Sequence, residues 1–180
     1  NTPARAVSTR GPNQPPSALS TLERSLTRSA MLNGTSIREH GLAIESALGD
    51  ATVRCPATDD LSALGPVDVA MLCVKLWNVE ATAPKIAGIV SNGGVVIPFQ
   101  NGVESADRVA ALLGPSHVLG GVAYIAATIR APGVIAHTGT MARLRVGAFP
   151  GGPEDRAAAF ADACRSAGVE IEHTPDIRRA

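Results

Sequence analysis

Aromatic side chains and an excess of either charge are what this chain of 180 residues most clearly lacks. It has one Trp, one Tyr and three Phe, and its 16 basic residues are balanced by 16 acidic ones. So few aromatics provide little surface on which bases could stack. A formally neutral chain also lacks the cationic surface that attracts nucleic acid or an anionic membrane. We therefore expect neither as a partner.

Cysteines and long apolar runs are also scarce. The three cysteines, at positions 55, 73 and 164, are odd in number and form no CxxC motif, and the four histidines show no metal-ligand spacing. A disulfide framework and a metal site are therefore not expected. This cysteine pattern favours a reducing, cytoplasmic setting. No run approaches the roughly 18 apolar residues that a membrane span needs.

The first 37 residues differ from the rest of the chain. They are rich in Ser, Thr, Arg and Pro, and Glu23 is their one acidic residue. Such a composition is typical of a disordered or irregular segment, with at most a short helix near residues 21–32. An acid-poor, Arg- and Ser-rich start is also found in transit peptides, which is the alternative interpretation.

Residues 38–180 alternate between strand and helix patterns, which predicts one α/β domain with a parallel sheet core and right-handed crossovers. Strands at 67–74 and 93–99 are apolar without alternation, so both faces should be buried. Later strands should extend one edge of the sheet in antiparallel fashion. The remaining predicted elements are a hairpin (41–46 and 51–55), helices at 81–91 (with Pro84 in its first turn), 102–114 and 153–167, strands at 117–129, 133–140 and 142–149, and a short strand at 169–174.

Polar side chains follow two of the predicted parallel strands. Lys75 comes after the first strand and Asn101 after the second. Ligands of open parallel sheets bind outside the carboxyl ends of the strands, so these two side chains should reach one ligand together. The ammonium would attract a phosphate or carboxylate, and the amide can both donate and accept hydrogen bonds.

Each of these residues also has a purely structural interpretation. Lys75 can extend past the strand end into water, and Asn101 before Gly102 can be a helix N-cap or a turn residue. Trp77 is of a type that more often packs than binds a cofactor. His137 fits a strand residue with a structural hydrogen bond.

Several motifs together resemble one enzyme family. "CVKLWNVEA", "PFQNGVESADRVAALLGPSHVLGGVAYIAATIRAPGVIAHTGT" and "MARLRVG" are similar to the ketopantoate reductase (2-dehydropantoate 2-reductase) family, and so are "REHGLAIES" and "AGVEIEHTPDIRRA". The specific signal is the combination of a strand-end lysine, the QNG triplet and the GVIxHxG strand. The resemblance runs from about residue 38 to residue 180.

The resemblance implies a Rossmann-like nucleotide-binding domain and NADPH-dependent reduction of 2-dehydropantoate, a small keto acid, to pantoate for pantothenate and coenzyme A synthesis. It places Lys75 and Asn101 beside the cofactor, with Asn101 also holding the keto acid. It places the backbone of Ala127 against the cofactor. A homo-oligomer is compatible with the sequence.

Two departures from the family pattern shape the expectation for activity. No GxGxxG motif occurs in the chain, although in the family this loop seats the cofactor pyrophosphate at a helix N-terminus. The family's general-acid lysine follows the motif that stands here as "DIRRA" and falls beyond Ala180, so no catalytic residue is assigned. We therefore expect this incomplete Rossmann-like chain to be inactive alone. The alternatives are a non-catalytic remnant, a nucleotide-binding module of the same fold, or an interaction protein that uses an exposed sheet edge.

Overall fold

A computed structural model describes residues 34–179, so the expectations for residues 1–30 and for a helix at 21–32 lie outside the described part of the chain. Helix α2 spans the boundary expected between residues 37 and 38. The elements are α2 (Gly34–His40), β1 (Leu42–Ser46), β2 (Ala51–Val53), η1 (Leu61–Ala63), β3 (Val67–Leu72), η2 (Leu76–Asn78), α3 (Val79–Ala87), β4 (Val90–Pro98), α4 (Ser105–Leu113), η3 (Pro115–His117), β5 (Leu119–Ala131), β6 (Val134–Ala148), α5 (Glu154–Ser166), β7 (Glu170–His173) and η4 (Ile177–Arg179).

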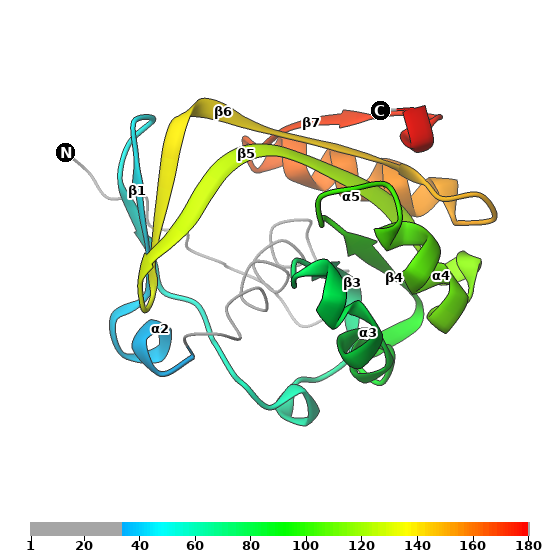
Figure 1. The fold of residues 1–180 in the computed structure, drawn as a ribbon, viewed down its shortest axis with the longest axis horizontal. Helices are drawn as coiled ribbons and strands as arrows, with labels where there is room; N and C mark the ends of the chain where they lie inside the picture. Colours follow the sequence, from blue (N-terminus) through cyan, green and yellow to red (C-terminus); the bar gives the residue numbers. More distant parts are fainter. Residues whose placement is uncertain (1–33, 180) are drawn as a thin grey trace, which may run out of the picture.

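Strands β3 and β4 form the centre of a three-layer arrangement (Figure 1). They pair in parallel, as predicted from their apolar runs. Alternate residues of β4 point to opposite layers: Val95 and Ile97 join the core under α5, whereas Val96 joins the core under α3 and α4. All three are 0% exposed. Burial on both faces, predicted from the absence of alternation, is therefore confirmed for β4.

The remaining strands form a second sheet in the order β2-β1-β6-β5, with β7 also paired to β6. The predicted parallel core with antiparallel strands beside it is present, and the structure adds that the antiparallel β5–β6 pair belongs to a separate sheet. Within residues 34–179, backbone pairing joins the two sheets at one place, a parallel bridge between Val96 and Val118. Beyond that bridge β5 turns away to pair antiparallel with β6, so the parallel sheet stops at β4.

The predicted strands at 133–140 and 142–149 are one strand, β6, so the expectation of two strands was wrong. Strands β5 and β6 form a single long hairpin that arches across the molecule (Figure 1). Its turn lies at Pro132 and Gly133, as predicted. Gly139, the second-last residue of the first of these predicted strands, has a φ of 84° within β6. It lies near the point where the pairing register with β5 shifts between Ile125 and Ala127, so it marks a bulge.

The helices follow the predicted pattern with two corrections to where they begin. Helix α4 begins at Ser105, three residues later than predicted, and ends at Leu113 before Gly114, whose φ of 86° suits glycine, and α5 covers most of the predicted range. Helix α3 begins earlier than predicted, at Val79, which places Pro84 at its sixth residue and not in its first turn. A proline there cannot donate to the carbonyl of Glu80, and the helix ends three residues later. No helix within residues 34–179 is long and apolar enough to cross a membrane.

Candidate functional site

The parallel register of β3 and β4 brings the two predicted site segments to one edge of the sheet. Leu72 and Pro98 are the last paired residues of the two strands. The chain beyond them stays together, because the Phe99 N–H and the Gln100 side chain both donate to the Leu72 carbonyl, at 3.0 and 2.9 Å. Lys75 and Asn101 each lie three residues past this last pair. In the backbone, both residues therefore lie beyond the carboxyl ends of these two strands, where they were predicted to be.

Lys75 immediately precedes the short helix η2 and is exposed. Its ammonium forms no salt bridge with the described part of the chain. Trp77, in the same turn, is 75% exposed, so the interpretation of Trp77 as a packing residue is wrong. A lysine and an indole thus lie exposed beyond the end of a buried strand.

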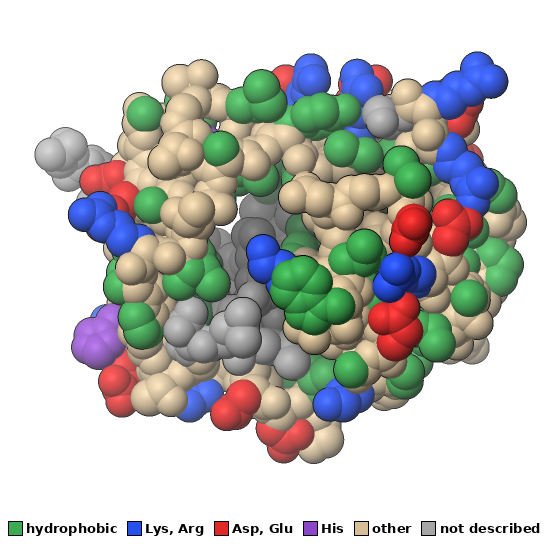
Figure 2. Space-filling view, viewed as in Figure 1, with side chains coloured by type: hydrophobic (Ala, Val, Ile, Leu, Met, Phe, Trp, Pro, Cys, Tyr) green, Lys and Arg blue, Asp and Glu red, His purple; other side chains and the backbone are tan. Residues whose placement is uncertain are grey.

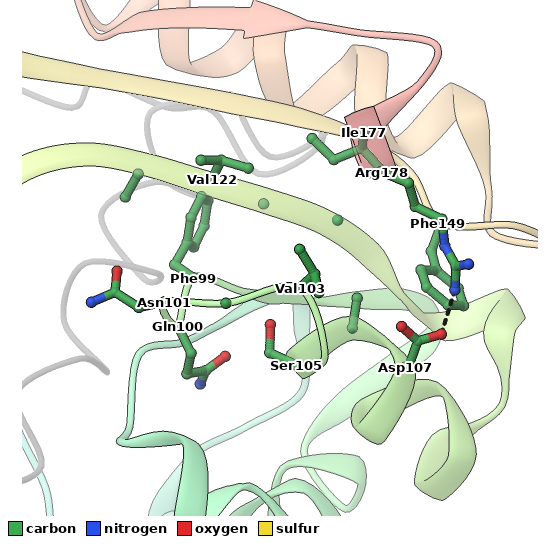
Figure 3. Close-up of a pocket in the computed structure, with 15 residues that line it drawn as sticks. Phe99, Gln100, Asn101, Val103, Ser105, Asp107, Val122, Phe149, Ile177 and Arg178 are labelled. Carbon is green, nitrogen blue, oxygen red and sulfur yellow. Dashed lines mark hydrogen bonds and ion pairs between the residues drawn. The ribbon is translucent and has the colours of Figure 1, made fainter. Parts of the chain in front are cut away.

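Asn101 is exposed in the loop before α4. The helix begins at Ser105 with Glu104 at its N-cap position, so Asn101 is not a helix cap. It contributes instead to the wall of a cavity of about 520 Å³. Figure 3 shows Asn101 at one end of this cavity and Asp107 with Arg178 at the other.

The cavity lies between α4 and the second sheet. Its walls come from the loop after β4, the first turn of α4, the start of β5, and three residues from later in the chain. The lining residues are Phe99, Gln100, Asn101, Gly102, Val103, Ser105, Ala106, Asp107, Gly120, Gly121, Val122, Ala123, Phe149, Ile177 and Arg178. Most of this wall is apolar, with polar groups near α4.

Two adjacent glycines shape the wall of this cavity that β5 forms. A Cβ at Gly120 would lie 2.6 Å from Ile177, and a Cβ at Gly121 would lie 2.7 Å from both Ile97 and Phe99. Such contacts are too close for any side chain, so glycine lets Ile177 and Phe99 approach the strand. A pair of glycines inside a predicted strand was the sequence signal for this close approach, and it was missed.

The polar groups near α4 were also missed by the sequence analysis. Ser105 is 5% exposed, and its hydroxyl has no hydrogen-bond partner within the described residues. Asp107 forms an ion pair with Arg178, and the Arg178 guanidinium lies 5.0 Å from the centre of the Phe149 ring. Gln100 Oε1 is buried and unpaired in the described structure. Arg178 comes from the short helix η4, so no local pattern could have placed it here.

The other predicted site residues lie outside this cavity. Ala127 is exposed on β5, opposite His137 in the pairing register and four residues beyond Ala123, which is the last cavity residue of that strand. Lys75 is not part of the wall either. His137 has the structural role that was expected: its two ring nitrogens lie 2.8 Å from Ser46 Oγ and 2.9 Å from the Met141 carbonyl oxygen.

Comparison with known proteins identifies the family. The family profile described as "Ketopantoate reductase PanE/ApbA" matches residues 25–151. This chain belongs to the ketopantoate reductase family. Its mixed α/β fold is that of the Rossmann-like domain of these enzymes.

Curated ketopantoate reductases are similar over much of this chain. The 2-dehydropantoate 2-reductase of Halobacterium salinarum is 30% identical over 147 residues, which cover 81% of this chain and 48% of that protein. The enzyme of the same name from a Nostoc species is 26% identical over 146 residues, which cover 78% of this chain and 46% of that protein. The chain therefore spans about half the length of the curated relatives it matches.

Solved structures agree with the family. A ketopantoate reductase from Ralstonia eutropha superposes with a TM-score of 0.71 at 29% identity, covering 81% of this chain and 47% of that one. A D-mandelate dehydrogenase solved with NADH and anilino(oxo)acetate has a TM-score of 0.70 at 20% identity, a likeness that shows the fold alone. Within residues 34–179 of this ketopantoate reductase family member, no three His, Cys, Asp or Glu side chains gather as metal ligands.

Proposed function

We propose that this chain forms part of the cofactor-binding region of an NADP-dependent 2-dehydropantoate 2-reductase. In this proposal the whole enzyme reduces 2-dehydropantoate to pantoate for pantothenate and coenzyme A synthesis, in the cytoplasm. The observation that supports it most is the shared sheet edge: the β3–β4 register places Lys75 and Asn101 three residues beyond the same strand pair. Ligands of open α/β sheets bind at such edges, and the family membership supplies the reaction.

The residues at this edge have distinct proposed roles. When bound, the reduced nicotinamide would supply a hydride for the keto carbon; the keto oxygen would also take up one proton, for which no residue of this chain is assigned as donor. The Lys75 ammonium binds an anionic group of the cofactor, since lysine is a compact positive charge that reaches phosphate readily. The Asn101 amide donates to and accepts from the cofactor and the keto acid. The backbone of Ala127 is proposed to touch the cofactor.

A second candidate function rests on one specific observation. No GxGxxG loop occurs in the 180 residues, and backbone N–H groups of such a loop carry much of dinucleotide binding. The second candidate is therefore a non-catalytic module that keeps a weak nucleotide site. The two candidates share the same cofactor contacts and differ in turnover.

The chain contains its own reporter for a binding experiment. Its one tryptophan, Trp77, is exposed and lies two residues from Lys75. Tryptophan fluorescence should therefore change when NADPH binds. With no glycine loop we expect a dissociation constant in the millimolar range, about −4 kcal/mol. Because NADPH absorbs strongly at such concentrations, the titration should include free tryptophan as a correction.

Two variants test the proposed contacts. Lys75→Ala should weaken NADPH binding by about tenfold, because a charge-assisted contact is lost. Asn101→Ala should weaken it by a smaller factor. Lys85→Ala is the matched control, since Lys85 is the chain's other lysine and lies on α3. Equal affinities for wild type, Lys75→Ala and Asn101→Ala would refute the proposed site.

A turnover assay then separates the two candidate functions. NADPH consumption that depends on 2-dehydropantoate supports the reductase, and cofactor binding without such consumption supports the module. The turnover assay and the binding titration should be made on the same preparation of the chain, so that the two results can be compared directly.

A further inference from the structure

The side chain of Gln100 connects the ends of the two parallel strands. Its Nε2 donates to the Leu72 carbonyl over 2.9 Å, between residues that are 28 positions apart in the chain. Leu72 is the last paired residue of β3, and Gln100 lies two residues beyond Pro98, the last paired residue of β4. The bond therefore continues the β3–β4 pairing past the point where the strands end.

The Leu72 carbonyl also fixes which way the Gln100 carboxamide points. A carbonyl oxygen can only accept, so Nε2 must face it, and Oε1 is left on the other side of the carboxamide. That oxygen is buried and has no hydrogen-bond partner among residues 34–179. The carboxamide thus makes one hydrogen bond and leaves a second polar atom unpaired, which is unfavourable for a buried group.

The Leu72 carbonyl does not depend on Gln100 for a partner. It also accepts from the Phe99 N–H at 3.0 Å, so it would stay satisfied without the carboxamide. An apolar side chain of similar volume at position 100 would leave no unpaired oxygen, and such replacements are well tolerated in packed surroundings. Stability alone therefore does not explain a glutamine at this position.

The bond from Gln100 lies between the two exposed segments of the proposed site. Lys75 follows one end of the bond by three residues, and Asn101 follows the other end by one. Val74 and Leu76, on either side of the lysine, pack against the core under α3 and α4, which anchors that segment to the core. Gln100 adds a second bond across the strand ends, closer to Asn101 than the backbone bond is, and so constrains the spacing between the two segments.

We propose that Gln100 is a positioning residue, which holds residues 75–78 at the spacing from Asn101 that lets Lys75 and Asn101 reach one ligand. Gln100 itself contacts neither cofactor nor keto acid in this proposal. Figure 3 shows the neighbouring Gln100 and Asn101 side chains pointing in different directions, which suits separate roles. The effect on ligand binding rests on the proposed function, whereas the coupling of the two segments rests on the bond to Leu72.

Gln100→Met tests the coupling without any ligand, because Met has a similar length and no hydrogen-bond donor. In the isotope-labelled chain, nuclear magnetic resonance should show amide shifts in residues 75–78 as well as in residues 99–102. The fluorescence anisotropy of Trp77, which lies in η2, should fall as this turn gains freedom. A glutamine that only packed against its own surroundings would shift residues 99–102 and leave residues 75–78 unchanged.

Stability and cofactor affinity should respond differently to Gln100→Met. The urea midpoint of unfolding should equal or exceed that of the wild type, since Leu72 keeps one partner and the unpaired oxygen is gone. NADPH should nevertheless bind about three- to tenfold more weakly, because Lys75 and Asn101 lose their fixed spacing. Asn92→Met is the matched control: it removes an exposed carboxamide near the opposite end of β4, and it should change neither NADPH affinity nor the signals of residues 75–78.

Three results would overturn the inference: amide shifts that stop at residues 99–102, a lower unfolding midpoint for Gln100→Met, or equal NADPH affinity of this variant and a wild type that binds. If the wild type does not bind NADPH, the proposed function fails, and the ligand-free shifts of residues 75–78 still decide whether Gln100 couples the two segments. If those shifts are absent while NADPH binds, the coupling fails and the proposed function stands.

Discussion

Cys164 illustrates how burial alone sets the chemistry of a single residue. It lies on the inner face of α5 and is 0% exposed within the core that this helix forms with β4 and β6. Burial raises the pKa of its thiol from 9.0 to about 11, and the neighbouring positive charge of Arg165 opposes this only in part. A thiol that stays protonated at neutral pH reacts slowly, so Cys164 is a packing residue.

The raised pKa of Cys164 predicts a loss of stability in alkaline solution. In the unfolded chain the thiol ionises near 9.0, whereas in the folded chain it ionises near 11. Between these values the unfolded state releases a proton that the folded state retains, so the free energy of unfolding should fall by about 1–3 kcal/mol. Urea unfolding measured across this pH range checks it. Cys164→Ala should remove this part of the pH dependence, and an unchanged dependence would contradict the assignment.

At the scale of secondary-structure elements, the His137 side chain connects three segments of the second sheet: the end of β1, the β1–β2 turn and the bulge of β6. The Met141 carbonyl can only accept, so Nε2 carries a proton and donates to it over 2.9 Å. Nδ1 lies 2.8 Å from the Ser46 Oγ, and the same hydroxyl oxygen accepts from the Leu48 N–H at 3.0 Å. This chain of hydrogen bonds links the β1–β2 turn to the bulge of β6. The His137–Met141 bond also spans the bulge, because Gly139 lies between these two residues.

Removing the imidazole should loosen the pairing of β1 with β6. His137→Ala should lower the free energy of unfolding by about 1–3 kcal/mol, because hydrogen bonds of a buried group are lost. Amide hydrogen exchange should speed up in β1 more than in β4. His40→Ala is the control, since the His40 side chain is 77% exposed. Equal exchange rates in β1 of the variant and the wild type would show that the backbone pairing alone holds the strand.

The whole molecule is built around β4, which both core clusters share. Val96 packs under α3 and α4, whereas Val95 and Ile97 pack under α5 with Val146 of β6. The two sheets are joined by the Val96–Val118 bridge within the described residues. A strand that contributes to both cores should make them unfold together.

Core truncations on the two sides of β4 test this cooperativity. Val96→Ala and Val146→Ala should each lower the free energy of unfolding by about 1–3 kcal/mol. Circular dichroism and Trp77 fluorescence should give coincident transitions in both variants. Val103→Ala, at an 84% exposed position, should change stability little. Separate midpoints for the two probes would show that the cores unfold as independent units.

Much of this fold could be predicted from two features of the sequence: the spacing of its apolar residues and the polar residues that follow its buried strands. The unalternated apolar runs of β3 and β4 predicted a buried parallel pair, because only a strand covered on both faces is apolar throughout. Parallel pairing then placed Lys75 and Asn101 at one edge, because parallel strands end on the same side of a sheet. The helices α4 and α5 were predicted for a similar local reason, an apolar face repeating along each segment.

Only the tertiary structure decided that β6 continues as one strand through Gly139 and what surrounds α4. Gly139 has the same local signature in a turn and in a bulge, and pairing with β5 selects the bulge. Ser105 was not singled out from the sequence, and its burial beside residues of β5 and η4 depends on tertiary packing. Arg178 and Asp107, 71 residues apart in the chain, meet because Ile177 packs against Gly120 of β5 and Gly147 of β6. Contacts between residues so distant depend on packing and leave no trace in local periodicity.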